Sequence, residues 1–293
     1  MQTDNASSPN LDRLTADDVD RLSYPELVAL VRETNRCPGG KRTINRIARL
    51  TLLDRESRVL EVGCTTGFTS IELAAISRAR ILGVDVIPAA VAEAERRRRA
   101  LPASMAERIE FRVADLFDLL GRIEPVDLVV VGGATTFMQR KQDAVQAYQL
   151  LLRPYGFLSV TTLFYRSEPP QDIVQRVGNI IGTRIDVKLA PDWLDLFTST
   201  GLELYHCERH ELDARPPEVI DAYVRYMLMQ PHLNGLCAEA RAALHGRWLE
   251  AMTAFNENHR YLGYLLALLR RNPFEEQPEL FLPRGTIVES SFR

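Results

Sequence analysis

Short apolar runs recur along the middle and end of the chain, and segments with helical periodicity separate them. Such runs, rich in Val, Ile and Leu and bounded by glycine, proline or acidic residues, are typical of buried strands. The pattern predicts strands at residues 59–62, 80–86, 109–114, 126–131, 157–164, 202–212 and 261–269. Periodicity alone does not distinguish a strand from a buried helix in the last run, which we interpret as a strand.

Helical patterns fill the intervals between these runs and the segment before the first of them. Residues 15–50 look helical, and Ser23-Tyr-Pro-Glu26 is a capping box that opens a helix to about Thr34. The breaker-rich loop Asn35–Gly40 leads to a second helix, 42–50. Further helices are expected at 68–77, 137–152, 171–181 and 192–200, with a turn at 153–156 and two helices within 217–256.

These elements predict an α/β fold with a seven-stranded sheet and helices on both faces. A helical N-terminal cap is expected at residues 1–50, the sheet domain at 51–272, and a helical insertion before the last strand at about 215–258. The residues from 273 to 293 are expected to form a C-terminal tail.

Composition narrows the class of protein. The chain has 293 residues, of which 46% are hydrophobic and 26% charged, as in ordinary globular proteins. A formal charge of −3 provides no broad attraction to nucleic acid or anionic membranes. No apolar run approaches the ~20 residues of a membrane span, and the polar N-terminus differs from a signal peptide. Four scattered cysteines fit reduced thiols, so we expect a cytoplasmic protein without a structural zinc.

Candidate chemistry begins where the first predicted strand ends. Glu61 closes that strand, and glycines at 63 and 67 form a turn before the next helix. Glycine lets the backbone bend sharply and approach a ligand, and a strand, a glycine turn and a helix together form the entry of a nucleotide-binding α/β unit. The turn lacks both the phosphate-loop ending and the three-glycine dinucleotide fingerprint, so a cofactor without a pyrophosphate is favoured.

The following strands deliver acidic or small residues at the same edge of the sheet. Asp85 ends the second strand, Asp115 follows the third, and Gly132 follows the fourth. Ligands of open α/β sheets bind at the carboxyl ends of the strands, where an acidic residue about twenty positions beyond the turn can bind ribose hydroxyls. The alternative is that Asp85 and Asp115 are helix caps or turn formers.

This set of motifs resembles the class I S-adenosylmethionine-dependent methyltransferases, a Rossmann-like family, from about residue 55 to 165 and more loosely to 270. The resemblance implies that Glu61 and the Gly63–Gly67 loop hold the amino-acid part of S-adenosylmethionine, Asp85 its ribose, and Asp115 with Leu116 its adenine. Thr65 stands where the family motif has its middle glycine, although its hydroxyl could bind the methionine carboxylate. The implied cofactor-binding residues at this edge are Glu61, Gly63, Cys64, Thr65, Gly67, Asp85, Val86, Asp115, Leu116 and Gly132.

A second segment adjoins this edge in sequence. The loop before the first strand contains Gly39 and Gly40, and Thr43 follows it. The loop could close over the methionine end of the cofactor, which would add these three residues to the cofactor site. Alternatively, it is a plain connector between two helices.

No catalytic base stands out. Tyr24, Thr135, Thr136, Tyr165 and Arg166 are polar and lie near the predicted mouth of the site, but each is a residue type more often used for packing or solvation. We therefore leave the catalytic residue unassigned.

Two further patterns suggest a metal site and a nucleic-acid site. His206 and His210 have the spacing of helical metal ligands. In a strand they stand ~13 Å apart, so we expect no metal site. The run of arginines at 96–99 follows Glu93 and Glu95, which favours a solvated helix face over nucleic-acid binding.

The leading interpretation is a methyltransferase that acts on a small-molecule acceptor, with secondary metabolism as one setting. The main alternative is a cyclase or lyase that consumes S-adenosylmethionine and releases methylthioadenosine. A third is a regulatory or scaffold subunit that binds the cofactor without turnover. We expect no nucleic-acid or membrane partner, and the oligomeric state stays open, a homodimer included.

Overall fold

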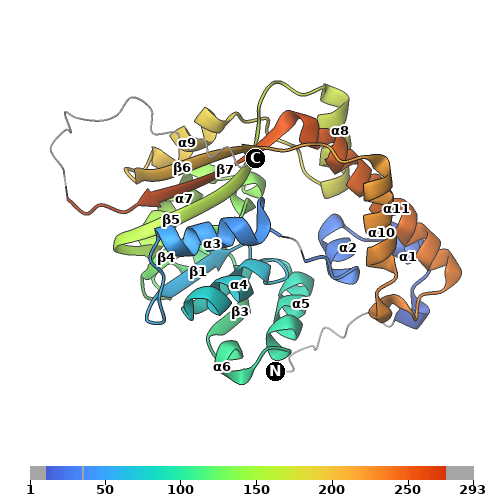
Figure 1. Ribbon diagram of the computed structural model, residues 1–293, viewed down its shortest axis with the longest axis horizontal. Coiled ribbons are helices and arrows are strands. Elements are labelled where there is room, and N and C mark those ends of the chain that lie inside the picture. The colour runs from blue at the N-terminus through green and yellow to red at the C-terminus, as the bar shows by residue number, and fades with distance from the viewer. Residues whose placement is uncertain (1–10, 35, 275–293) are drawn as a thin grey trace. The chain divides into compact units, whose positions relative to one another are not determined.

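The computed structural model describes residues 11–34 and 36–274, which form two compact units (Figure 1). The sheet unit contains Thr34–Glu168, Asp186–Leu212 and the chain from Tyr261 on. The helical unit contains the chain up to Glu33, Pro169–Ile185 and Asp213–Arg260. The polar first ten residues, Asn35 of the predicted loop, and the predicted tail from residue 275 on lie outside the described residues.

The described part of the sheet unit contains one seven-stranded sheet in the order β3-β2-β1-β4-β5-β7-β6. Strands β1 to β5 pair in parallel, and β7 lies antiparallel between β5 and β6. The strands are β1 (Arg58–Val62), β2 (Arg80–Asp85), β3 (Ile109–Val113), β4 (Val126–Val131), β5 (Leu152–Tyr165), β6 (Glu203–Glu211) and β7 (Leu262–Arg270). The predicted seven-stranded α/β fold is confirmed, and the run at 261–269 is a strand.

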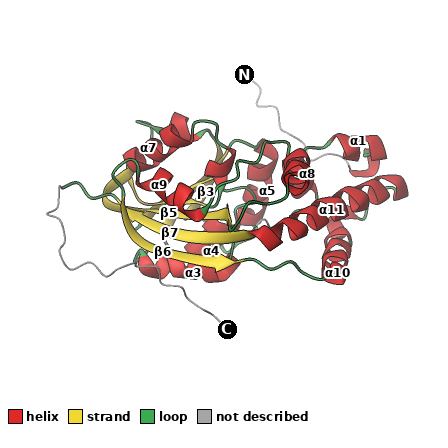
Figure 2. Ribbon diagram, turned by 90° about the horizontal axis from the view of Figure 1, so that it is seen from above, coloured by secondary structure: helices red, strands yellow, loops and turns green. Residues whose placement is uncertain are grey.

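Helices cover both faces of this sheet (Figure 2). One apolar core joins α3 (Gly40–Leu50), α4 (Phe68–Ser77) and α5 (Pro88–Arg99) to one face. The other core joins α7 (Lys141–Leu151) and α9 (Ala190–Thr198) to the opposite face. Short helical turns complete the unit: α6 (Ala103–Ala106), η2 (Leu116–Leu119) and η3 (Ala134–Phe137). Alternating side-chain directions along each strand place apolar residues in both cores.

The helical unit has its own core around Trp248, which is fully buried. Its elements are η1 (Leu11–Arg13), α1 (Ala16–Arg21), α2 (Tyr24–Leu30), α8 (Gln171–Ile181), α10 (Pro217–Leu228), η4 (Pro231–Leu233) and α11 (Ala238–Asn258), and η5 (His259–Tyr261) leads back to β7. The predicted helical insertion before the last strand is therefore present as α10 and α11. No helix in the described ranges combines the length and apolar character needed to cross a bilayer.

Several predicted boundaries differ from the observed ones. The capping box forms, with Glu26 accepting from both the N–H and the hydroxyl of Ser23, but α2 ends at Leu30. The helix predicted from 137 begins at Lys141, because Phe137 ends η3 and residues 138–140 are not helical. The predicted turn at 153–156 lies inside β5, where Tyr155 has a left-handed φ of 64° and the pairing shifts register.

The grouping of residues 1–50 as one cap also differs from the observed packing. Helix α3 packs against the sheet through the buried side chains of Ile44 and Ile47, whereas α1 and α2 belong to the helical unit. The three helices were grouped because they are neighbours in the sequence. Their buried side chains belong to different cores, so α3 is not part of one cap with α1 and α2.

Candidate cofactor site

A glycine turn lies at the carboxyl end of β1. Gly63 has φ 77° and Gly67 φ 81°, conformations that favour glycine. A Cβ on Gly63 would lie 2.6 Å from the Cβ of Ala134, so a side chain there would displace either the loop or η3. The loop thus passes close to η3 because residue 63 has no side chain. Gly67 begins α4 and packs against Phe111.

Glu61 is buried at the base of this turn, with 3% of its surface exposed. Ser70 of α4 donates its N–H (2.9 Å) and its hydroxyl to one carboxylate oxygen. Burial raises the pKa of Glu61 to about 7, since it outweighs the hydrogen bonds from Ser70 and Thr69. The nearby charge of Asp85 acts in the same direction as burial. A cationic ligand group would therefore be favoured beside this carboxyl.

Asp85 joins the second strand to the glycine turn. Its Oδ2 accepts the Thr65 N–H at 2.9 Å, and its Oδ1 accepts the Ile87 N–H at 3.0 Å. Thr65 has φ 45°, a left-handed conformation that is strained for a β-branched residue. The carboxylate of Asp85 thus holds Thr65, the residue that replaces the middle glycine of the motif. Its bond to the Ile87 N–H is that of a turn former, which was the alternative role for Asp85.

A cavity of about 50 Å³ lies at this turn. Of the predicted cofactor residues, five line it: Glu61, Gly63, Cys64, Thr65 and Gly132. Arg36, Cys37 and Thr69 also line it, although the sequence analysis did not assign them to the site. Thr69 could have been found because it follows the glycine turn. Arg36 and Cys37 lie in the Asn35–Gly40 loop that was expected near the methionine end of the cofactor, although only Gly39 and Gly40 of that loop were named.

The other predicted cofactor residues do not line this cavity. Gly39, Gly40 and Thr43 lie at the start of α3, and the Gly40 N–H bonds to the Cys37 carbonyl. Val86 is 57% exposed, just past β2.

At the third strand, Asp115 is exposed and accepts the Phe117 N–H. It therefore caps η2, the alternative role considered for it in place of adenine binding. Leu116 is buried in the core that lies under α7. Its side chain is therefore occupied with packing.

The weak catalytic candidates are engaged within the protein. Tyr24 packs between Trp248 and Phe255 in the helical unit. Thr135 is buried, and its hydroxyl lies 3.0 Å from that of Tyr148. Tyr165 is 5% exposed near the end of β5.

The two remaining candidates have polar partners. Arg166 forms an ion pair with Glu211. The Thr136 hydroxyl lies 3.4 Å from that of Thr162. None of the five candidates lines the cavity at the glycine turn.

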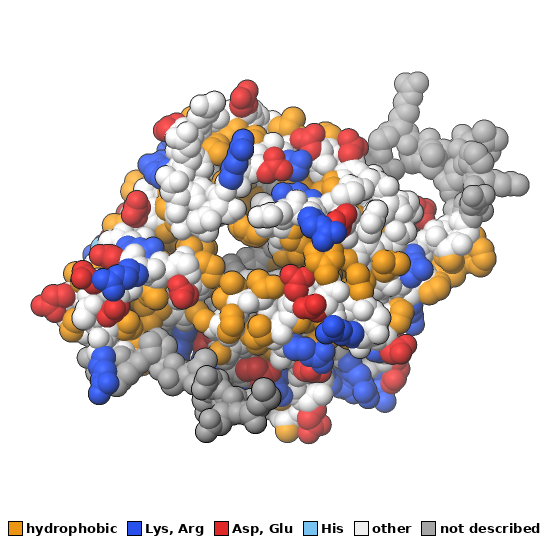
Figure 3. Space-filling model, turned by 180° about the vertical axis from the view of Figure 1, so that it is seen from behind, with side chains coloured by type: hydrophobic (Ala, Val, Ile, Leu, Met, Phe, Trp, Pro, Cys, Tyr) orange, Lys and Arg blue, Asp and Glu red, His pale blue; other side chains and the backbone are white. Residues whose placement is uncertain are grey.

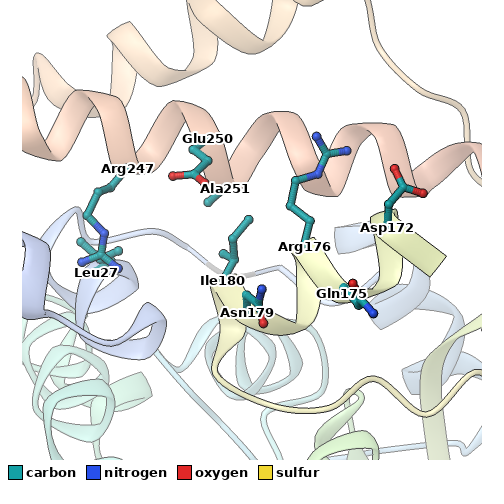
Figure 4. Close-up of a pocket in the computed structure, with 9 residues that line it drawn as sticks. All are labelled: Leu27, Asp172, Gln175, Arg176, Asn179, Ile180, Arg247, Glu250 and Ala251. Carbon is teal, nitrogen blue, oxygen red and sulfur yellow. The ribbon is translucent and has the colours of Figure 1, made fainter. Parts of the chain in front are cut away.

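The helical unit contains a second, larger cavity of about 430 Å³ (Figure 4). Helices α2, α8 and α11 line it. The polar side chains that line it include Gln175, Asn179, Arg247 and Glu250, and the apolar ones are Leu27, Ile180 and Ala251. Cavities of about 300–1,000 Å³ are typical of small-molecule sites.

The residues at the glycine turn fit the amino-acid end of S-adenosylmethionine. Arg36 offers a guanidinium for a carboxylate, and the buried Glu61 carboxyl suits an ammonium group. The close approach of the backbone at Gly63 and the acidic residue that ends β2 complete the set. Fold and site together define a cofactor-binding α/β transferase.

Comparison with known proteins agrees with this class. Residues 60–158 match a family model described as a methyltransferase domain. An uncharacterized protein of Haemophilus influenzae is 26% identical over 176 residues, which cover 59% of this chain and 69% of that protein.

Solved structures share the fold. The MccD protein has a TM-score of 0.68 at 22% identity, covering 81% of this chain and all of that one. The [4+2]-cyclase SpnF has a TM-score of 0.64 at 19% identity, covering 85% and 94%. A methyltransferase from Thiobacillus denitrificans in complex with S-adenosylhomocysteine has a TM-score of 0.54 at 20% identity, covering 78% and 90%.

The resemblance predicted from the sequence agrees with these findings. Residues 60–158 are similar to a methyltransferase domain, and the chain shares its fold with solved S-adenosylmethionine-dependent methyltransferases.

Proposed function

We propose that this chain transfers a methyl group from S-adenosylmethionine to a small-molecule acceptor, with secondary metabolism as its setting. The observation that carries the proposal is the convergence of Glu61, the Gly63–Gly67 turn and Asp85 at the carboxyl edge of the sheet. When bound, the cofactor supplies an already activated methyl group. The protein then has mainly to align the partners, a contribution of up to ~7–11 kcal/mol.

The surface of the protein favours a small acceptor over nucleic acid. On the face in Figure 3, basic and acidic side chains are interspersed. The arginines at 96–99 all form ion pairs with Glu93 or Glu95 on α5. A nucleic-acid face would instead present unpaired basic side chains to phosphates. The cavity of the helical unit has the volume of a small-molecule site.

Turnover tests the proposal. The protein is incubated with S-adenosylmethionine and a panel of phenols, amines, thiols and carboxylic acids, and released S-adenosylhomocysteine is measured. We expect release that depends on the acceptor. Cofactor binding without acceptor-dependent release across the panel would contradict the small-molecule transfer and favour a regulatory subunit.

A cyclase or lyase is the second candidate. The hydroxyls of Thr135 and Tyr148 are paired with each other, so they are not poised to deprotonate an acceptor. One protein with a similar fold is a [4+2]-cyclase, so the fold is not confined to methyl transfer. Incubation with S-adenosylmethionine alone decides between the two candidates, because methylthioadenosine release without an acceptor supports the lyase and excludes simple transfer.

A further inference from the structure

A polar cluster lies on the face of β6 and β7 that α3 covers. His206, Glu208 and His210 alternate along β6, so their side chains leave the strand on the same face. Glu208 is only 4% exposed. Its carboxylate lies 2.7 Å from Nε2 of His206 and 3.3 Å from Nε2 of His210, and Arg46 of α3 donates to it at 2.5 Å. The spacing that suggested metal ligands in the sequence thus brings both imidazoles to one carboxylate.

This carboxylate determines which ring nitrogen of His210 carries a proton. Burial raises the pKa of Glu208, but the hydrogen bonds from His206 and Arg46 outweigh it, so the pKa lies below its ordinary value. An ionised carboxylate only accepts hydrogen bonds, so Nε2 of His210 must be the donor. Nδ1 of the neutral ring then carries a lone pair, and within the described residues no hydrogen bond reaches that nitrogen.

The cluster lies at the ligand-binding edge of the sheet. The ring of His210 stacks on Tyr264 with centroids 4.6 Å apart. Tyr264 pairs with Leu163, three residues beyond Val160, which pairs with Val131 at the end of β4. The His210–Tyr264 pair therefore lies beyond the carboxyl end of β4, the edge that carries the glycine turn.

Tyr264 connects this pair to the wall of the cofactor cavity. A Cβ on Gly39 would lie 2.6 Å from the Tyr264 hydroxyl, and that hydroxyl bonds to Thr43. The same segment supplies Arg36 and Cys37 to the cavity lining. An imidazole with a free lone pair thus lies one aromatic ring away from the segment that lines the cofactor cavity.

We propose that His210 is the base that accepts the proton of the methyl acceptor, with Glu208 and Tyr264 as positioning residues. This inference rests on the proposed methyl transfer. Nδ1 takes the proton from an acceptor X–H group, and the X–H bonding pair stays on X. That pair forms the new X–C bond, the former S–C pair remains on sulfur, and the Glu208 carboxylate balances the imidazolium charge. A well-placed base contributes ~10²–10⁴-fold in rate.

The first test needs no acceptor. The full chain is labelled with ¹⁵N in its five histidine rings, and His210→Gln identifies the signal of His210 by its disappearance. We expect the neutral ring of His210 to carry its proton on Nε2 and to leave Nδ1 unprotonated. A proton on Nδ1 would overturn the proposal.

The second test uses S-adenosylhomocysteine binding and acceptor-dependent turnover. His210→Gln should retain S-adenosylhomocysteine affinity, lose at least 10²-fold in kcat, and lose the acid limb of the pH–rate profile. The charged and titratable groups that act on Tyr264 or Glu208 are otherwise unchanged in this variant: Cys37, Arg42, Arg46 and His206.

His206→Gln provides the comparison, because His206 has the shorter contact to the same carboxylate. A purely structural cluster would make it at least as damaging as His210→Gln, and that result would overturn the proposal. If the wild type does not bind S-adenosylhomocysteine, the methyltransferase proposal fails and the base assignment with it. If it binds and His210→Gln turns over normally, only the base assignment fails.

Discussion

At the scale of single residues, Glu61 links the cofactor site to the stability of the fold. Its carboxyl is buried, and its pKa of about 7 lies above the ordinary value of 4.5. The folded protein therefore holds this proton more tightly than the unfolded chain does. The free energy of unfolding receives its full contribution below pH 4.5 and loses it as the pH rises to about 7.

We predict that Glu61→Gln removes this pH dependence, because an amide does not titrate. Between pH 5 and pH 8 the wild type should lose on the order of 3 kcal/mol of unfolding free energy relative to the variant. Urea unfolding of both proteins at the two pH values measures the difference. Parallel pH dependences for the two proteins would show that Glu61 is ionised throughout.

At the scale of elements, the segment before α3 forms part of the wall of the cavity at the glycine turn. The Arg36 guanidinium lies 5.5 Å from the ring centre of Phe68, and the Thr66 hydroxyl donates to the Thr34 carbonyl at 3.0 Å. The cavity beneath holds about 50 Å³, whereas a small-molecule site of ordinary size has at least ~300 Å³. The cavity therefore holds only part of an adenosyl ligand, and we expect the segment to respond when the ligand binds.

We predict that S-adenosylhomocysteine changes the amide hydrogen exchange of the 36–40 segment together with that of the 63–67 turn. Both segments contact the same cavity, and Gly39 and Gly40, with φ of 76° and 55°, mark where the backbone bends. Peptides from α9, which packs on the opposite face of the sheet, serve as the internal reference. Protection of the turn without any change at 36–40 would show that the segment is only a connector.

Helix and strand boundaries could be predicted from the sequence where particular residue types mark the ends of an element. The exact span Phe68–Ser77 and the strand Val126–Val131 were predictable because a glycine or charge marks each end. The turn predicted at 153–156 is an irregularity inside β5, where the pairing with β4 skips these residues and Tyr155 has a left-handed φ of 64°. The loop of Arg36 and Cys37 was expected near the glycine turn, but which of its side chains face the cavity depends on tertiary packing.

The histidine cluster shows a similar limit. The spacing of His206 and His210 on a predicted strand argued against a shared metal. The same alternation places Glu208 between them on one face of the strand, a signal in the sequence that was not used. Arg46 and Tyr264, which complete the cluster, are remote in sequence and belong to other elements. Contacts between residues of α3, β6 and β7 form only in the folded protein, so no sequence motif indicates them.

At the scale of the whole molecule, the two units each contain one tryptophan. Trp193 is buried in the core of the sheet unit and Trp248 in the helical unit, and the chain contains no other tryptophan. Single-tryptophan variants therefore report on the units separately.

We predict that saturating S-adenosylhomocysteine raises the urea midpoint reported by Trp193 in the Trp248→Phe variant. A ligand at 100 times its Kd adds about 2.7 kcal/mol to the unit that binds it. The Trp193→Phe variant reports through Trp248. Its urea midpoint should rise only to the extent that the helical unit unfolds together with the sheet unit. If the urea midpoint shifts more when reported by Trp248 than by Trp193, the cofactor site does not lie in the sheet unit.

The central claim is that the Gly63 turn binds the cofactor, and a matched pair of glycine variants tests it. Gly63 and Gly121 have φ of 77° and 70°, so alanine imposes similar backbone strain at both. A Cβ at 63 meets Ala134 at 2.6 Å, whereas a Cβ at 121 meets nothing within 4 Å.

Isothermal titration with S-adenosylhomocysteine should therefore show one site per chain in the wild type and in Gly121→Ala. In Gly63→Ala, affinity should fall at least about tenfold, or ~1.4 kcal/mol. No binding to the wild type, or equal affinity in all three proteins, would contradict the account.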